Sequence, residues 1–205
     1  MNKDTYQTKD TKNKLETIEW DDIWFEHTAS DPEMRIAYIG DSISRGTRRN
    51  ITTLSEMKIL CDNYATSKAL DNPYFTAQIS LFAKQQKRCD ALLFNNGLHG
   101  WHLDDEKEYP ELLEKMLVFL KKEFSAARII LVLTTFITDE KRNQRVQKRN
   151  SAAIRICEKL GIEFLDLYTL TKDNARLLIA DGVHFTPEGY EKIALAQIEK
   201  LREKK

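Results

Sequence analysis

From residue 35 onward, short apolar runs alternate with longer amphipathic stretches. The apolar runs are short and rich in β-branched residues, which predicts strands. The stretches between them repeat apolar positions at three- and four-residue spacing, which predicts helices. The predicted strands are residues 35–39, 57–61, 91–94, 128–133 and 162–167.

Helices are predicted in the intervals between these strands and at the end of the chain. Pro73 suits the first turn of one helix, and Gly161 suits the end of another. Alternating strands and helices give a parallel sheet with helices on both faces. We therefore expect an α/β fold: a three-layer α/β/α sandwich around a central, mostly parallel, five-stranded sheet. One predicted helix follows residues 40–42. The others cover 73–86, 107–123, 141–160 and the stretch from Pro187.

The residues before the first predicted strand fall into two parts. Residues 1–16 are polar and rich in lysine, which predicts a mobile tail. Residues 17–34 carry five large apolar side chains, too many for a free tail. We expect this stretch to pack across the body of the protein as an arm, so that 17–205 form one domain. The five side chains are Ile18, Trp20, Ile23, Trp24 and Phe25.

Length, composition and charge exclude several classes of protein. A chain of 205 residues suits one domain with a sizeable core. The 32 Lys and Arg balance the 32 Asp and Glu, so bulk attraction to nucleic acid or an anionic membrane is not expected. No apolar run approaches the roughly 20 residues that cross a bilayer. The start lacks a signal peptide, which predicts a cytoplasmic protein, or a secreted one if a leader preceded residue 1. Nothing in the sequence predicts an oligomeric state.

Neither a metal nor another cofactor is expected. The cysteines, Cys61, Cys89 and Cys157, are widely spaced and form no disulfide framework or paired metal site. His99 and His102 are three residues apart, but no third zinc ligand follows at a spacing typical of zinc sites. The chain also lacks a glycine-rich phosphate-binding loop.

Gly40-Asp41-Ser42 follows the first predicted strand and opens a helix. Ligands of parallel sheets bind at the carboxyl ends of the strands. At this position the Ser42 hydroxyl is exposed, and the helix N-terminus favours developing negative charge. The alternative interpretation is that Asp41 or Ser42 caps the helix.

Asp181 and His184 precede the last predicted helix and are three residues apart. A carboxylate beside a histidine orients the imidazole and stabilises its protonated form, and the histidine can then deprotonate a serine. The alternative is a turn with a helix cap at Asp181 or Thr186. The combination with Ser42 after the first strand favours the catalytic interpretation.

The order of these pieces resembles the SGNH/GDSL hydrolase superfamily. Its first block, G-D-S, is matched by residues 40–42, and its last, D-x-x-H, by residues 181–184. The resemblance covers residues 35–205 and implies a flavodoxin-like SGNH hydrolase fold. It also implies that Ser42 is the nucleophile, His184 the general base and Asp181 its orienting partner.

Two middle blocks of the superfamily normally complete the oxyanion hole with the nucleophile, and both depart from the pattern here. The second block usually offers a glycine N–H, but residues 62–70 contain no glycine and place Lys68 there. The third block, G-x-N-D, puts His99 at the position of the asparagine. Asn96 is chemically the more familiar amide donor, so both side chains remain candidates beside the N–H of Ser42.

Four residues near these motifs are candidate substrate contacts. Arg45 follows the nucleophile and could meet an anionic group, or form an exposed ion pair. Trp101 could form an aromatic platform for a sugar, or simply pack. Asp41 and Ser67 adjoin the candidate nucleophile and the second block. The basic run at 141–149 predicts a solvated surface with ion pairs.

Residues 94–101 look like those of a carbohydrate-esterase-like branch of the superfamily. The first hypothesis is therefore a serine esterase that removes small acyl groups, acetyl above all, from a small-molecule or carbohydrate ester. A lysophospholipase or thioesterase of the same fold is the alternative among enzymes. A different class is a non-catalytic α/β module that binds a sugar or phosphate at the helix N-terminus near Ser42.

Overall fold

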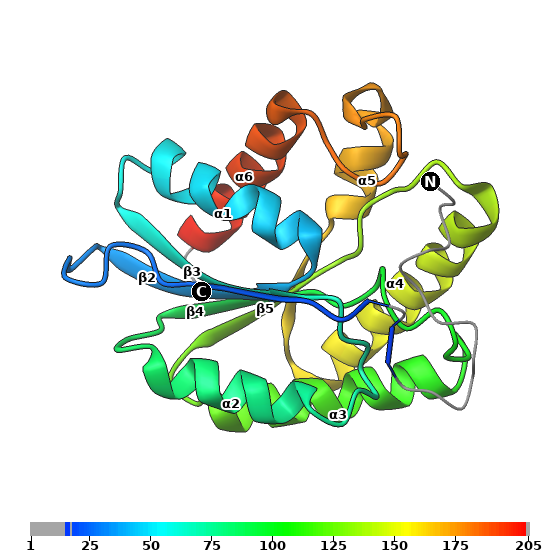
Figure 1. Ribbon diagram of the computed structural model, residues 1–205, viewed down its shortest axis with the longest axis horizontal. Helices are drawn as coiled ribbons and strands as arrows, with labels where there is room; N and C mark the ends of the chain where they lie inside the picture. Colours follow the sequence, from blue (N-terminus) through cyan, green and yellow to red (C-terminus); the bar gives the residue numbers. More distant parts are fainter. Residues whose placement is uncertain (1–14, 17, 204–205) are drawn as a thin grey trace.

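The computed structural model describes residues 15–16 and 18–203. Residues 1–14 of the predicted polar tail therefore lie outside the described residues. A mixed, mostly parallel sheet lies between two layers of helices (Figure 1). This arrangement confirms the predicted α/β architecture.

The sheet has the strand order β1-β3-β2-β4-β5-β6. All neighbouring strands are parallel except β1, which is antiparallel to β3. The chain crosses from β3 to β4, which lies on the other side of β2. The carboxyl ends of β2 and β4 therefore form the switch point at which ligands bind in open α/β sheets. The strands are β1 (Asp21–Trp24), β2 (Met34–Gly40), β3 (Ile59–Thr66), β4 (Ala91–Phe94), β5 (Arg128–Val132) and β6 (Glu163–Leu165).

The number of strands is six and not the predicted five, because part of the expected arm joins the sheet as β1. Asp21 pairs with Thr66 and Trp24 with Asn63. The partner strand β3 also runs five residues beyond its predicted end at Cys61. Its polar residues resemble a loop in sequence, but they are satisfied inside the fold. Asp62 accepts from Arg35 at 2.9 Å, for example.

The helices cover the two faces of the sheet. Helices α1 and α6 contact each other on one face, with α5 beside α6, while α2 and α3 lie on the other face (Figure 1). Gly161 ends α4 in the left-handed conformation with φ of 62°. The predicted strand 162–167 ends early because Asp166 caps α5. The helices are α1 (Ser42–Leu54), α2 (Phe75–Gln85), α3 (Glu108–Glu123), α4 (Glu140–Leu160), α5 (Leu167–Lys172), α6 (Pro187–Arg202) and the 3₁₀ helix η1 (Ala175–Leu177).

Apolar clusters on both faces hold the sheet and helices together. One cluster joins Leu92 of β4 to Phe82 of α2 and Leu117 of α3. The other contains Ile51 of α1 and Ile198 of α6. The central strands are buried on both sides, which explains their continuous apolar runs. Within the described residues, no helix combines the length and apolar character needed to cross a membrane.

Candidate active site

Ser42 begins α1 directly after β2. The preceding residue, Asp41, is the N-cap of this helix and accepts a hydrogen bond from the Ile43 N–H at 2.9 Å. Burial raises the pKa of the Asp41 carboxyl, although the nearby His99 and His184 act in the opposite direction. Asp41 is thus a buried cap and not the substrate contact expected from the sequence. Its role in the fold is to hold the start of α1, where the Ser42 hydroxyl lies.

His184 and Asp181 lie in the loop before α6 and contact each other through their side chains. His184 Nδ1 is 2.7 Å from Asp181 Oδ2. Asp181 Oδ1 also accepts from the backbone N–H groups of Val183 and His184, at 2.8 and 2.9 Å. Burial acts to raise the pKa of Asp181, but these hydrogen bonds outweigh it and the pKa is lowered. The carboxylate is therefore held in its ionised form beside the imidazole.

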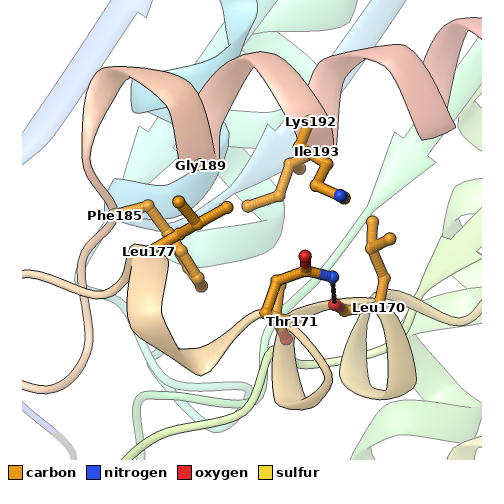
Figure 2. Close-up of a pocket in the computed structure, with 8 residues that line it drawn as sticks. Leu170, Thr171, Leu177, Phe185, Gly189, Lys192 and Ile193 are labelled. Atoms are coloured by element: carbon orange, nitrogen blue, oxygen red, sulfur yellow. Dashed lines mark hydrogen bonds between the residues drawn. The ribbon is translucent and has the colours of Figure 1, made fainter.

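The loop that carries His184 is anchored by its neighbour, Phe185. Leu178 and Phe185 form an isolated β-bridge, and Ile179 N donates to the His184 carbonyl at 2.8 Å. Figure 2 shows Phe185 beside Leu177 and Gly189, at an apolar cavity of about 10 Å³ between α5, η1 and α6. A Cβ at Gly189 would lie 2.9 Å from the Phe185 Cβ. Close packing here restricts where the loop, and with it His184, can lie.

Ser42 and His184 meet although 142 positions separate them in the sequence. Ser42 Oγ lies 2.7 Å from His184 Nε2. The structure therefore joins a hydroxyl, an imidazole and a carboxylate in one hydrogen-bonded chain. An imidazole placed in this way can take the proton of the serine, while the carboxylate stabilises the imidazolium that forms.

Lys68 and Ser67, in the loop after β3, are engaged with the protein itself. The Lys68 N–H donates to Thr66 Oγ1 at 3.1 Å, and the ammonium group contacts Asp21 at 2.8 Å. Ser67 is buried, and its Oγ accepts from the Trp20 N–H at 3.0 Å. Ser67 therefore holds the N-terminal arm, which corrects its expected role as a substrate contact.

The two candidate donors of the third block have different surroundings. Asn96 Nδ2 donates to the Lys68 carbonyl at 2.7 Å, so this amide links two loops. His99 Nδ1 is buried 3.7 Å from Glu16 Oε1, and the ring makes no hydrogen bond to the described residues. His99 lies close enough to the buried Asp41 to lower its pKa. Its ring is therefore near the start of α1, and Glu16 lies within ion-pair distance of its Nδ1.

Trp101 and Arg45 take structural positions. The Trp101 ring packs against three guanidinium groups of α4, with Arg149 Cζ 4.7 Å from the ring centroid. This packing matches the alternative expected from the sequence, and the sugar platform stays a prediction. The Arg45 side chain is largely exposed and pairs with Asp22 of β1 at 3.1 Å.

The two histidines considered as zinc ligands lie beside different acidic residues, His99 near Glu16 and His102 beside Asp71. His102 Nε2 pairs with Asp71 at 3.0 Å. No three His, Cys, Asp or Glu side chains converge in a way that could hold a metal ion within residues 15–16 and 18–203.

Two residues at the site have no signal in the sequence. Arg149 belongs to the basic run expected at the surface, yet it is fully buried and contacts the loop that contains His99. Glu16 belongs to the predicted polar tail, yet it is buried and bonds the same loop. Only contacts between distant parts of the chain reveal them.

The chain matches no protein-family model and no curated protein. It is similar to several solved structures. A lipase/acylhydrolase from Enterococcus faecalis is 16% identical over 82% of this chain and 95% of that one, with a TM-score of 0.65. An acetylxylan esterase from Geobacillus stearothermophilus is 15% identical over 85% and 97%, with a TM-score of 0.65. A member of the lipolytic G-D-S-L family from Veillonella parvula is 20% identical over 81% and 97%, with a TM-score of 0.64. These likenesses confirm the expected fold.

Proposed function

We propose that this chain, which has the SGNH/GDSL hydrolase fold, is a serine esterase that hydrolyses small acyl esters through an acyl-enzyme. The observation that carries the proposal is the hydrogen-bonded chain of Ser42 Oγ, His184 and Asp181, with 2.7 Å at each step. The same three residues match the first and last blocks of the superfamily.

The reaction runs in two stages. His184 Nε2 takes the proton of Ser42 as its oxygen attacks the ester carbonyl, and the resulting imidazolium is stabilised by Asp181. The imidazolium then protonates the departing alcohol, which leaves an acyl group on Ser42. In the second stage His184 deprotonates a water molecule, which attacks the acyl carbonyl. The acid is released, and Ser42 recovers its proton.

The negative charge on the carbonyl oxygen needs donors that are already in place. We assign one to the backbone N–H of Ser42 at the start of α1, where the helix dipole adds to the effect. We assign the other to the ring of His99 in preference to Asn96, whose amide nitrogen bonds the Lys68 carbonyl. The Lys68 N–H is held by Thr66 and serves as a donor only if this loop rearranges.

The substrate class rests on the comparisons. The likeness to an acetylxylan esterase supports an acetyl ester on a carbohydrate as the substrate.

The first test compares p-nitrophenyl acetate hydrolysis by the wild type and Ser42→Ala. Ser151→Ala, at an exposed position of α4, is the control for an unrelated serine. We expect turnover by the wild type and the control and none by Ser42→Ala. A fluorophosphonate should label Ser42 in the wild type, because the reagent requires an activated serine.

Chain-length dependence then separates the enzyme classes. The proposal predicts that acetyl esters are hydrolysed faster than octanoyl esters and that acetylated sugars are deacetylated. Faster hydrolysis of long-chain esters would indicate a lysophospholipase or thioesterase. Equal activity of the wild type and Ser42→Ala would exclude Ser42 as the nucleophile. No turnover and no labelling would indicate a binding module.

A further inference from the structure

The loop of residues 96–100 carries both side-chain candidates for the oxyanion hole, and one buried arginine binds its backbone. Arg149 Nη1 donates to the carbonyls of Gly97 and His99, at 3.1 and 2.7 Å. Arg149 Nη2 donates to the carbonyl of Gly100 at 2.8 Å. Three of the five carbonyls of this short segment thus bond a single side chain from α4.

The guanidinium group is itself held firmly. Arg149 is fully buried, and its Nε donates to Asp105 Oδ1 at 2.7 Å. Its Cζ lies 4.7 Å from the ring centroid of Trp101 and 4.5 Å from that of Tyr109. Tyr109 adds a bond of its own, from its hydroxyl to the Asn96 carbonyl at 2.9 Å. Four of the five carbonyls of the loop are therefore bonded, three by Arg149 and one by Tyr109.

Stability alone gives a poor account of this arrangement. Moving a guanidinium out of water is costly, and a buried ion pair is often no more stabilising than well-packed apolar residues. A planar fork of N–H donors does, however, fix several acceptors in one geometry. Oxyanion donors need that kind of rigidity, because they act only when they are already placed.

We propose that Arg149 is a positioning residue that preorganises the loop 96–100, and through it the ring of His99, for the oxyanion. The inference rests on the proposed esterase function and names a residue that the superfamily motifs do not contain. Arg149 acts through the loop and does not contact the substrate. Lysine cannot replace it, because a single ammonium group lacks the planar fork that spans three carbonyls.

The test compares Arg149→Lys with Arg145→Lys. Arg145 is a matched control: it lies one turn earlier on α4, packs on the same Trp101 ring and bonds the same Asp105. Its other bonds go to the carbonyls of Trp101 and Leu103, outside the loop 96–100. Both variants lose arginine bonds to the same region, but only Arg149→Lys releases the loop.

We expect Arg149→Lys to lower kcat by up to about 100-fold, the cost of a misplacement near 1 Å, with KM changed little. Arg145→Lys should keep kcat near the wild-type value. Thermal unfolding of both variants, and kcat corrected for the folded fraction, separate a positioning role from a loss of fold. The rate at which a fluorophosphonate labels Ser42 should fall with kcat in Arg149→Lys only.

The outcomes separate this inference from the proposed function. If the wild type is active and folded Arg149→Lys has the same kcat as the wild type, the positioning role of Arg149 is wrong. The proposed esterase function then still stands. Equal losses in the two variants, or a loss explained by unfolding, also overturn it. A wild type that neither hydrolyses esters nor labels at Ser42 overturns both.

Discussion

The side chain of Glu16 accepts a hydrogen bond from the backbone N–H of Gly100 at 2.9 Å, across 84 positions of sequence. The same oxygen lies 3.7 Å from His99 Nδ1. The residue directly before the N-terminal arm thus reaches the loop that Arg149 binds from α4. The loop beside the candidate nucleophile is held by two elements that have no part in the superfamily motifs.

Glu16→Gln keeps an oxygen for the Gly100 N–H but removes the negative charge near His99. Donation from the ring to the oxyanion leaves more positive charge on the imidazole, and a carboxylate 3.7 Å from Nδ1 favours that charge. We expect kcat to fall about tenfold, the equivalent of about 1.4 kcal/mol. The fall should disappear in a His99→Asn background, where the donor is a neutral amide.

Glu26→Gln is the control for Glu16→Gln, since this buried carboxylate of the arm bonds Trp24 and pairs with His27. It should leave kcat unchanged. An equal effect of Glu16→Gln in the wild-type and His99→Asn backgrounds would show that Glu16 acts only on the fold of the arm.

Asp181→Asn keeps the size of the side chain but removes the charge that stabilises the His184 imidazolium. We expect kcat to fall by about 10⁴-fold with the fold intact. The measurement is kcat for p-nitrophenyl acetate beside thermal unfolding, with the exposed Asp173→Asn as control. A loss below tenfold would exclude Asp181 as the orienting partner.

Gly97→Ala should destabilise the loop 96–100 where it approaches Thr134, just after β5. A Cβ at this position would lie only 1.7 Å from Thr134 Oγ1 and 2.8 Å from the Thr134 Cβ. Such overpacking costs about 1–3 kcal/mol in the free energy of unfolding. Urea unfolding measures the cost, and kcat should fall with it. A free energy of unfolding equal to that of the wild type would contradict the close approach.

Glu163 should make stability depend on pH at the acidic end. The hydrogen bond from Arg128, together with Lys200, lowers the pKa of Glu163 to about 2. A lowered carboxyl pKa contributes stability that is present above the unfolded value of about 4.3 and is lost as pH falls through about 2. The contribution is at most about 1 kcal/mol, because this ion pair is partly exposed to solvent.

Urea unfolding of the wild type and Glu163→Gln at several pH values measures this contribution. The wild type should be the more stable protein at pH 6, and the difference should shrink as pH falls below 4. A difference that stays constant down to pH 2 would show that the carboxylate charge does not contribute.

Local pattern was sufficient for most of the strands and helices and for the order of the motifs. The apolar runs 91–94 and 128–133 predicted β4 and β5 because a strand buried on both faces needs continuous apolar residues. Gly40-Asp41-Ser42 follows the apolar run 35–39, which placed the start of α1 at the carboxyl end of a strand. Each of these features depends on residues that are close together in the chain.

Local pattern failed where the hydrogen-bond partners of a buried polar residue lie far away in the sequence. Asp62 and Asn63 look like loop residues, yet they lie in β3 because Arg35 and the Tyr38 carbonyl satisfy them. The sequence predicted Ser67 as a substrate contact, but in the structure its hydroxyl accepts a hydrogen bond from the arm. Polar side chains do not reveal their partners in sequence, so their burial could not be foreseen.

The sequence by itself determined an α/β fold of alternating strands and helices, with a serine after its first parallel strand and an acid–histidine pair before its last helix. Only the tertiary structure decided that Ser42 meets His184, that the arm adds β1 to the sheet, and that Arg149 is buried beneath the loop 96–100. The physical reason is that periodicity and turn chemistry act over a few residues. Packing joins residues as far as 159 positions apart, such as Tyr38 and Gln197.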